Sequence, residues 1–134
     1  MTDLEEVKEN GYELEFVKEQ TPEICLAAVK QTGYAIEFVK VQTPELCLAA
    51  VKVNGYALKF VKEQNHEICL EAVKQNSWAL EYVKNQTYDI CLIAVRNNSR
   101  VLGFVEPDKK FLFEEEYKNL TLNEIKNKVP ELFL

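Results

Sequence analysis

A motif of 22 residues recurs along this chain and limits its fold more than any other feature. The four cysteines, Cys25, Cys47, Cys69 and Cys91, follow one another at intervals of 22 residues, and the residues around them repeat as well. Complete copies occupy 20–41, 42–63, 64–85 and 86–105, a partial copy occupies 1–19, and residues 106–134 do not repeat. Because internal repeats are typical of stacked architectures, the sequence predicts a single repeat domain over residues 1–134.

Each copy carries the signals for the start of a helix. The residues Thr21, Thr43, Asn65 and Thr87 are expected N-caps, because their side-chain oxygens can accept hydrogen bonds from free backbone N–H groups. Pro22 and Pro44 suit the first helical position. A carboxylate follows in each copy, where it faces the positive end of the helix dipole.

A glycine or serine marks the end of this first helix. Gly33 and Gly55 predict a left-handed residue that terminates the helix, with Tyr34 or Tyr56 then packing against it as in a Schellman motif. Ser77 replaces the glycine in a later copy, and in a left-handed conformation it would cost roughly 1 kcal/mol. The segment that follows predicts a second helix of about two turns.

Stacking of these helix pairs predicts an α-solenoid. Both helices carry apolar residues over a wide arc, as expected for helices covered by neighbours on two sides. A single repeat would not fold alone, because ordering its residues costs about 33 kcal/mol at roughly 1.5 kcal/mol per residue. A leucine-rich repeat has a similar period, but its L-x-L strand is missing from this unit. The predicted fold class is therefore all-α, a solenoid of 22-residue two-helix repeats with a partial N-terminal repeat.

The two ends of the chain are expected to cap the stack. Thr2 with Glu5, and Thr121 with Glu124, form the spacing of a capping box. The tail 106–134 supplies apolar residues to cover the last repeat, after a turn at 107–110. The net charge of −6 divides into −5 for residues 1–19, +1 for 20–105 and −2 for 106–134. These acidic caps would discourage end-to-end association.

The repeated motif resembles a known family. The residues EICLAAVKQTGYA at 23–35, with their copies over residues 4–105, are similar to the bacterial and viral repeat family catalogued as domain of unknown function 4116. The resemblance implies short helical-hairpin repeats. The family has no agreed activity, so the resemblance assigns no functional residue.

Nothing in the cysteine or histidine pattern predicts an enzyme. Equivalent residues of packed neighbouring helices lie roughly 9–10 Å apart, which is too far for a disulfide. Four cysteines in a line also cannot converge on a metal ion. We expect a row of buried thiols in a reducing compartment, which predicts a cytoplasmic protein. His66 is the only histidine and stands at the proline position of a helix start. We therefore predict no catalysis, no metal and no cofactor.

The aromatic residues Tyr12, Tyr34, Tyr56 and Trp78 recur at one position of the repeat and allow two interpretations. Aromatic rings beside lysines could stack the bases of a single-stranded nucleic acid. Packing against the end of the first helix is the alternative, and it accounts for the column without any ligand. Arg100 interrupts the column in the last copy.

Rows of charge on the second helices are the best candidate for a binding surface. In a curved stack the shorter helices fit the inner radius, so we expect the second helices to line the concave face. The candidate partner-binding residues are Lys18, Glu37, Lys40, Lys59, Lys62, Glu81 and Lys84. The sequence thus predicts a protein–protein interaction module, with Lys59 suited to an acidic segment of the partner.

Two other functions remain open at this stage. A nucleic-acid-binding solenoid would use the lysine rows, although the adjacent carboxylates oppose it. A structural or self-assembling spacer would use the open-ended geometry of a solenoid. We expect a protein partner, no membrane and a monomer that could self-associate, since the chain has neither a long apolar span nor a secretory leader.

Overall fold

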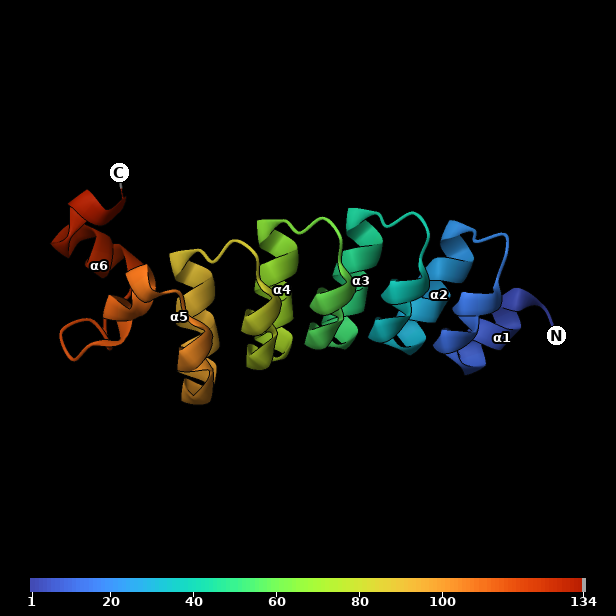
Figure 1. The fold of residues 1–134 in the computed structure, drawn as a ribbon, viewed down its shortest axis with the longest axis horizontal. Helices are drawn as coiled ribbons and strands as arrows, with labels where there is room; N and C mark the ends of the chain where they lie inside the picture. Colours follow the sequence, from blue (N-terminus) through green and yellow to red (C-terminus); the bar gives the residue numbers. More distant parts are fainter. Residues whose placement is uncertain (134) are drawn as a thin grey trace.

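The computed structural model shows a row of short helix pairs that runs from one terminus to the other (Figure 1). The structure describes residues 1–133, so Leu134, the last residue of the expected cap, lies outside the described residues. The α-helices are α1 (Asp3–Glu9), α2 (Pro22–Gln31), α3 (Pro44–Val53), α4 (His66–Gln75), α5 (Tyr88–Asn97) and α6 (Leu122–Lys128). No strand occurs in residues 1–133, which confirms the all-α solenoid and excludes a leucine-rich repeat.

The second helix of each repeat is a 3₁₀-helix, which is narrower than an α-helix. These helices are η1 (Gly11–Phe16), η2 (Gly33–Phe38), η3 (Gly55–Phe60), η4 (Ser77–Tyr82) and η5 (Ser99–Phe104), and the tail adds η6 (Pro107–Phe113) and η7 (Pro130–Phe133). Six residues at three per turn make the two turns that the sequence predicts. An asparagine caps the start of η1, η3, η4 and η5. In η3, for example, the side chain of Asn54 accepts a hydrogen bond from the backbone N–H of Tyr56 at 3.0 Å.

Most of the expected caps of the α-helices form. The side chains of Thr21, Thr43 and Asn65 each accept from a backbone N–H three residues later. Thr87 is the exception and the prediction for it is wrong, because its hydroxyl donates to the Asp89 carboxylate instead of accepting from the helix. Thr121 and Glu124 form a complete capping box at the start of α6.

The predicted left-handed glycines are not found. None of the residues 1–133 has a positive φ, so neither Gly33 nor Gly55 ends its helix in a Schellman motif. Both glycines are instead required by close approach, because a Cβ at Gly33 would collide with the carbonyl oxygen of Ala50 in the next repeat. Ser77 begins η4 at the same position of the repeat, and its φ is not positive either. The expected conformational cost of serine therefore does not apply.

The core is continuous along the stack and consists of small and branched side chains. Each repeat contributes an alanine and a valine from its α-helix and an aliphatic residue from its 3₁₀-helix, such as Ala28, Val29 and Ile36, all fully buried. The four cysteines are buried in the same core, as predicted, and none is in a disulfide. Neighbouring repeats therefore share one hydrophobic interior, and no repeat has a core of its own.

A glutamine at the start of each complete copy bonds the end of that copy, and Gln20 and Gln42 also bond the preceding copy. The sequence analysis did not identify these glutamines. The Gln42 amide donates to the carbonyl oxygens of Phe60 at 2.9 Å and Ile36 at 3.1 Å, while its Oε1 accepts from the backbone N–H of Lys62 at 3.0 Å. The Cys47 thiol also donates to this oxygen. Gln20, Gln64 and Gln86 make equivalent bonds to the end of their own copies, and Gln20 also donates to the carbonyl oxygen of Leu14 in the preceding copy at 3.4 Å. Each glutamine satisfies backbone groups that side-by-side helices would otherwise leave unpaired.

The C-terminal segment covers the last repeat, as expected. Leu112 of η6 and Ile125 of α6 are fully buried, and Phe111 packs edge-on against Tyr88 of α5. The hydroxyl of Tyr88 donates to the carbonyl oxygen of Leu132 at 3.2 Å. The stretch expected to be a turn, 107–110, is the first part of η6.

Candidate functional site

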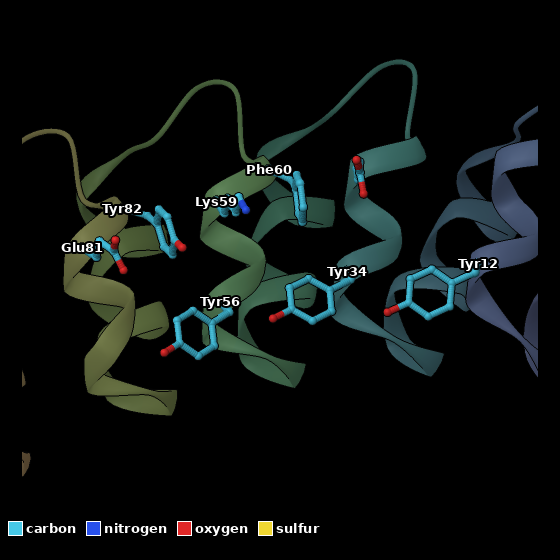
Figure 2. Close-up of a pocket in the computed structure, with 8 residues that line it drawn as sticks. Tyr12, Tyr34, Tyr56, Lys59, Phe60, Glu81 and Tyr82 are labelled. Atoms are coloured by element: carbon cyan, nitrogen blue, oxygen red, sulfur yellow. The ribbon is translucent and has the colours of Figure 1, made fainter.

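An open hollow on the face of the 3₁₀-helices spans four consecutive copies of the repeat. It has a volume of about 510 Å³ and is lined by Tyr12, Tyr34, Glu37, Tyr56, Lys59, Phe60, Glu81 and Tyr82. Figure 2 shows Tyr12, Tyr34 and Tyr56 in one row, with Phe60, Lys59, Tyr82 and Glu81 across the hollow from them. The hollow is thus built from equivalent positions of η1 to η4 rather than from one irregular loop.

The 3₁₀ geometry explains why aromatic and charged residues share this face. At three residues per turn, side chains three positions apart lie directly above one another. Tyr34 and Glu37 are so related in η2, as are Tyr56 and Lys59 in η3. The buried Ile36 of η2 points instead into the core. Each of these 3₁₀-helices therefore places one aromatic and one charged residue, three positions apart, on the same surface.

The tyrosines pack against aromatic residues of the next repeat. The rings of Tyr34 and Phe60 are 5.9 Å apart and nearly perpendicular, and Tyr56 and Tyr82 are 6.2 Å apart in the same arrangement. Tyr12 has no such partner among the aromatic pairs of residues 1–133 and is 45% exposed. The expected Schellman contact is therefore wrong, and the rings form the wall of a surface hollow.

The three charges of the hollow are exposed and do not neutralise one another. No ion pair within residues 1–133 joins Lys59 to Glu37 or Glu81. The Lys59 ammonium lies 5.6 Å from the centre of the Phe60 ring and 6.0 Å from that of Tyr82, within the range of a cation–π contact. Desolvation, followed by the nearby Tyr82 and Glu81, raises the pKa of the Tyr56 hydroxyl above its usual value. The hollow thus presents carboxylate, ammonium and carboxylate in succession.

The other predicted surface residues lie in the loops that follow the 3₁₀-helices. The Lys40 ammonium donates to the carbonyl oxygen of Lys18 at 3.1 Å, and that of Lys84 donates to Lys62 at 3.4 Å. The structure therefore divides the seven candidates into two groups. Glu37, Lys59 and Glu81 belong to the hollow, whereas Lys18, Lys40, Lys62 and Lys84 form a separate row whose side chains partly cap the preceding loop.

The cysteines do not line this hollow, and their thiols are buried and protonated. Burial raises the pKa of the Cys69 thiol to about 11 and that of Cys91 to about 12, so neither is a thiolate at neutral pH. Their sulfur atoms donate to the glutamine side chains at 3.3 and 3.4 Å. Among residues 1–133, no group of three or more histidine, cysteine and acidic side chains could hold a metal ion.

His66 lies at the exposed start of α4, where the sequence places it, and it also reaches the next repeat. Its Nε2 is 2.7 Å from the Asp89 carboxylate at the start of α5. Burial alone would raise the pKa of Asp89, but hydrogen bonds from Thr87 and His66 outweigh it and lower the pKa below its usual value. This pair is therefore a contact between two repeats.

The aromatic partners across the hollow were missed by the sequence analysis. Phe38, Phe60, Tyr82 and Phe104 recur at one position of the repeat, which is as regular as the tyrosine column. Glutamines at 20, 42, 64 and 86 recur with the same regularity. Periodicity alone could have singled out both sets, but it does not show which groups they contact. The aromatic partners belong to neighbouring copies, and the glutamines bond backbone groups about 18 and 20 residues away.

The comparison with protein families agrees with these helical pairs. The model of a family described as a domain of unknown function, DUF4116, matches residues 43–87 and again, overlapping, residues 65–108. Residues 43–108 are thus similar to this family, in overlapping matches that agree with a repeated segment. The two matches begin just before α3 and α4. They end just before α5 and at the start of η6. No curated protein and no solved structure matched the chain. None of the helices within residues 1–133 has the length and apolar character needed to cross a membrane.

Proposed function

We propose that this protein is a non-catalytic interaction module that binds a segment of another protein in the hollow on its 3₁₀-helix face. The single observation that carries the proposal is the hollow itself, where aromatic and charged side chains from four repeats line one surface. Aromatic residues are enriched where proteins bind one another, because they bury a large area at low entropic cost. A partner segment would run along the stack and contact each repeat in turn.

Charge argues against nucleic acid as the ligand of this hollow. Glu37 and Glu81 flank the only lysine among its lining residues, so a phosphate backbone would meet two carboxylates for one ammonium. The loop lysines remain as an alternative surface for nucleic acid. A steep decrease in affinity as salt increases is the signature of phosphate contacts, and binding of single-stranded DNA with such a slope would favour the alternative.

Affinity capture from a native cell extract tests the proposal. The protein, its Lys59→Glu variant and its Lys52→Glu variant serve as three baits. Lys59 lies in the hollow, whereas Lys52 is exposed on α3, so both variants make the same change of charge on different faces. We expect a partner that the unchanged protein and Lys52→Glu capture and that Lys59→Glu loses. Identical capture lists for the three baits would contradict the proposal.

A second pair of variants separates the aromatic contribution from the charge. Tyr56→Ala removes a ring that lines the hollow, and Phe16→Ala removes a ring that is 72% exposed and lies outside it. Only Tyr56→Ala should weaken capture of the same partner. Circular dichroism of both variants checks that the helical content is unchanged.

A further inference from the structure

The spacing of charges in the hollow identifies the kind of segment that fits it. Glu37, Lys59 and Glu81 occupy the same position of η2, η3 and η4, so they recur once per repeat along the stack. Packed neighbouring helices are separated by about 8–10 Å. An extended peptide advances about 3.1–3.3 Å per residue, so three of its residues match one repeat. A bound segment would therefore place every third side chain against one charge of the row.

Only one extended conformation directs every third side chain to the same side. In a β-strand the side chains alternate, so residues three apart point to opposite faces. A polyproline II helix has three residues per turn, and its residues i, i+3 and i+6 line one edge. The row of single charges in this hollow therefore fits a polyproline II segment better than a β-strand.

The aromatic wall fits the same conformation. Tyr12, Tyr34 and Tyr56 follow one another along the hollow, and Phe60 and Tyr82 face them (Figure 2). Grooves lined by aromatic side chains bind proline-rich segments, whose conformation is already formed and costs little entropy on binding. Prolines between the charged residues of a ligand would lie against these rings.

Charge complementarity completes the ligand. Glu37 and Glu81 are exposed carboxylates that a basic side chain could pair with, and the exposed Lys59 between them would pair with an acidic one. Resting on the function proposed above, we propose that the hollow binds a proline-containing segment with basic, acidic and basic residues at every third position, as in Lys-Pro-Pro-Glu-Pro-Pro-Lys. The charge pattern reads the same in both chain directions, so it does not depend on the orientation of the segment.

Fluorescence anisotropy with labelled synthetic peptides tests this inference. The probe is Lys-Pro-Pro-Glu-Pro-Pro-Lys, and the first control, Glu-Pro-Pro-Lys-Pro-Pro-Glu, reverses every charge. Exposed ion pairs contribute about 0.2–1 kcal/mol each, so exchanging three attractions for three repulsions should weaken binding at least roughly tenfold. A second control, Lys-Gly-Gly-Glu-Gly-Gly-Lys, keeps the charges without the stiff conformation and should also bind more weakly. Equal affinity for the probe and the charge-reversed peptide, or no binding of the probe at millimolar concentration, would overturn the inference.

A charge exchange on the protein provides the complementary measurement. Lys59→Glu should lose affinity for the probe and gain it for Lys-Pro-Pro-Lys-Pro-Pro-Lys, because the central pair is restored with opposite signs. Lys52→Glu, with the same change of charge on the face of α3, should keep the preferences of the unchanged protein. The inference is wrong if Lys52→Glu changes these preferences as much as Lys59→Glu does.

The results also separate this inference from the broader proposal. If Lys59→Glu loses a captured partner but the peptides do not bind, the hollow is still an interaction surface and only the polyproline II ligand is wrong. If neither the capture nor the peptide binding responds to Lys59→Glu, both the inference and the proposed function fail.

Discussion

Removal of one of the repeated glutamines tests how much these side chains stabilise the stack. Gln42 bonds the carbonyl oxygens of Ile36 and Phe60 and the backbone N–H of Lys62, at 3.1, 2.9 and 3.0 Å. In Gln42→Ala these three backbone groups lose their partner, one in the preceding copy of the repeat and two at the end of the copy that Gln42 begins. A typical intramolecular hydrogen bond contributes about 0.5–1.5 kcal/mol, and a buried group left unsatisfied costs more, so we expect a loss of about 2–4 kcal/mol.

Equilibrium unfolding in urea measures this loss as a shift in the midpoint. Gln31→Ala is the matched control, because the exposed Gln31 side chain accepts only one hydrogen bond across repeats, from the backbone N–H of Gly11. The control should lose about 1 kcal/mol. If the two variants are equally stable, the Gln42 side chain does not stabilise the stack through its three backbone bonds and our reasoning is wrong. A broader transition in Gln42→Ala would indicate that the two sides of the junction unfold separately.

Four further outcomes follow from the packing and the pKa shifts. Gly33→Ala should lose about 1–3 kcal/mol in urea unfolding, because its Cβ collides with the Ala50 carbonyl oxygen, whereas Gly103→Ala, with open space around it, should change stability little; equal effects would contradict the close-approach role of Gly33. Cys47→Ala should cost about 1–2 kcal/mol by leaving a small cavity, which the same assay measures. The native thiols should react slowly with a thiol reagent, and rapid labelling of all four in the folded protein would exclude a buried row. Because burial raises the pKa of Cys69 to about 11 and of Cys91 to about 12 from 9.0, the contribution of these two thiols to stability should be constant below pH 9 and decrease as pH rises above it. Because the pKa of Asp89 is lowered by Thr87 and His66 against the effect of burial, its contribution should be present above about pH 4 and lost at lower pH; the difference in unfolding free energy between the unchanged protein and Asp89→Asn should shrink between pH 5 and pH 3.

Much of the fold could be predicted because the same helix-capping residues and apolar pattern recur in each copy of the repeat. Thr21, Thr43 and Asn65 cap their helices as their side-chain chemistry requires, and the 3₁₀-helices begin where the first helices end. The same reasoning failed at Gly33, where conformational freedom was the expected role and lack of a side chain is the actual one. The sequence does not show whether a glycine is needed for a left-handed conformation or for close approach. Only the distance to the next repeat distinguishes these two roles.

The candidate site could be predicted only in part. Glu37, Lys59 and Glu81 were chosen from the charge pattern, and the structure brings them together in the hollow. The loop lysines were chosen by the same pattern, but the backbone leaves the 3₁₀-helix before it reaches them, so they point to a different part of the surface. The tyrosines were expected to pack under the helix ends, yet their rings meet Phe60 and Tyr82 of the next repeat.

By itself, the sequence determined the repeat length, the helical class, the start of most helices and the burial of the cysteines. These properties depend on contacts within one repeat or on the apolar pattern, and both are visible in a single copy. The tertiary structure decided the partners of the glutamines, the reason for the glycines and the face that is hollowed. Each of these depends on contacts between residues far apart in the sequence and on the direction in which their side chains point. The hollow lies across the junctions between repeats, and so its shape became visible only when the repeats were stacked.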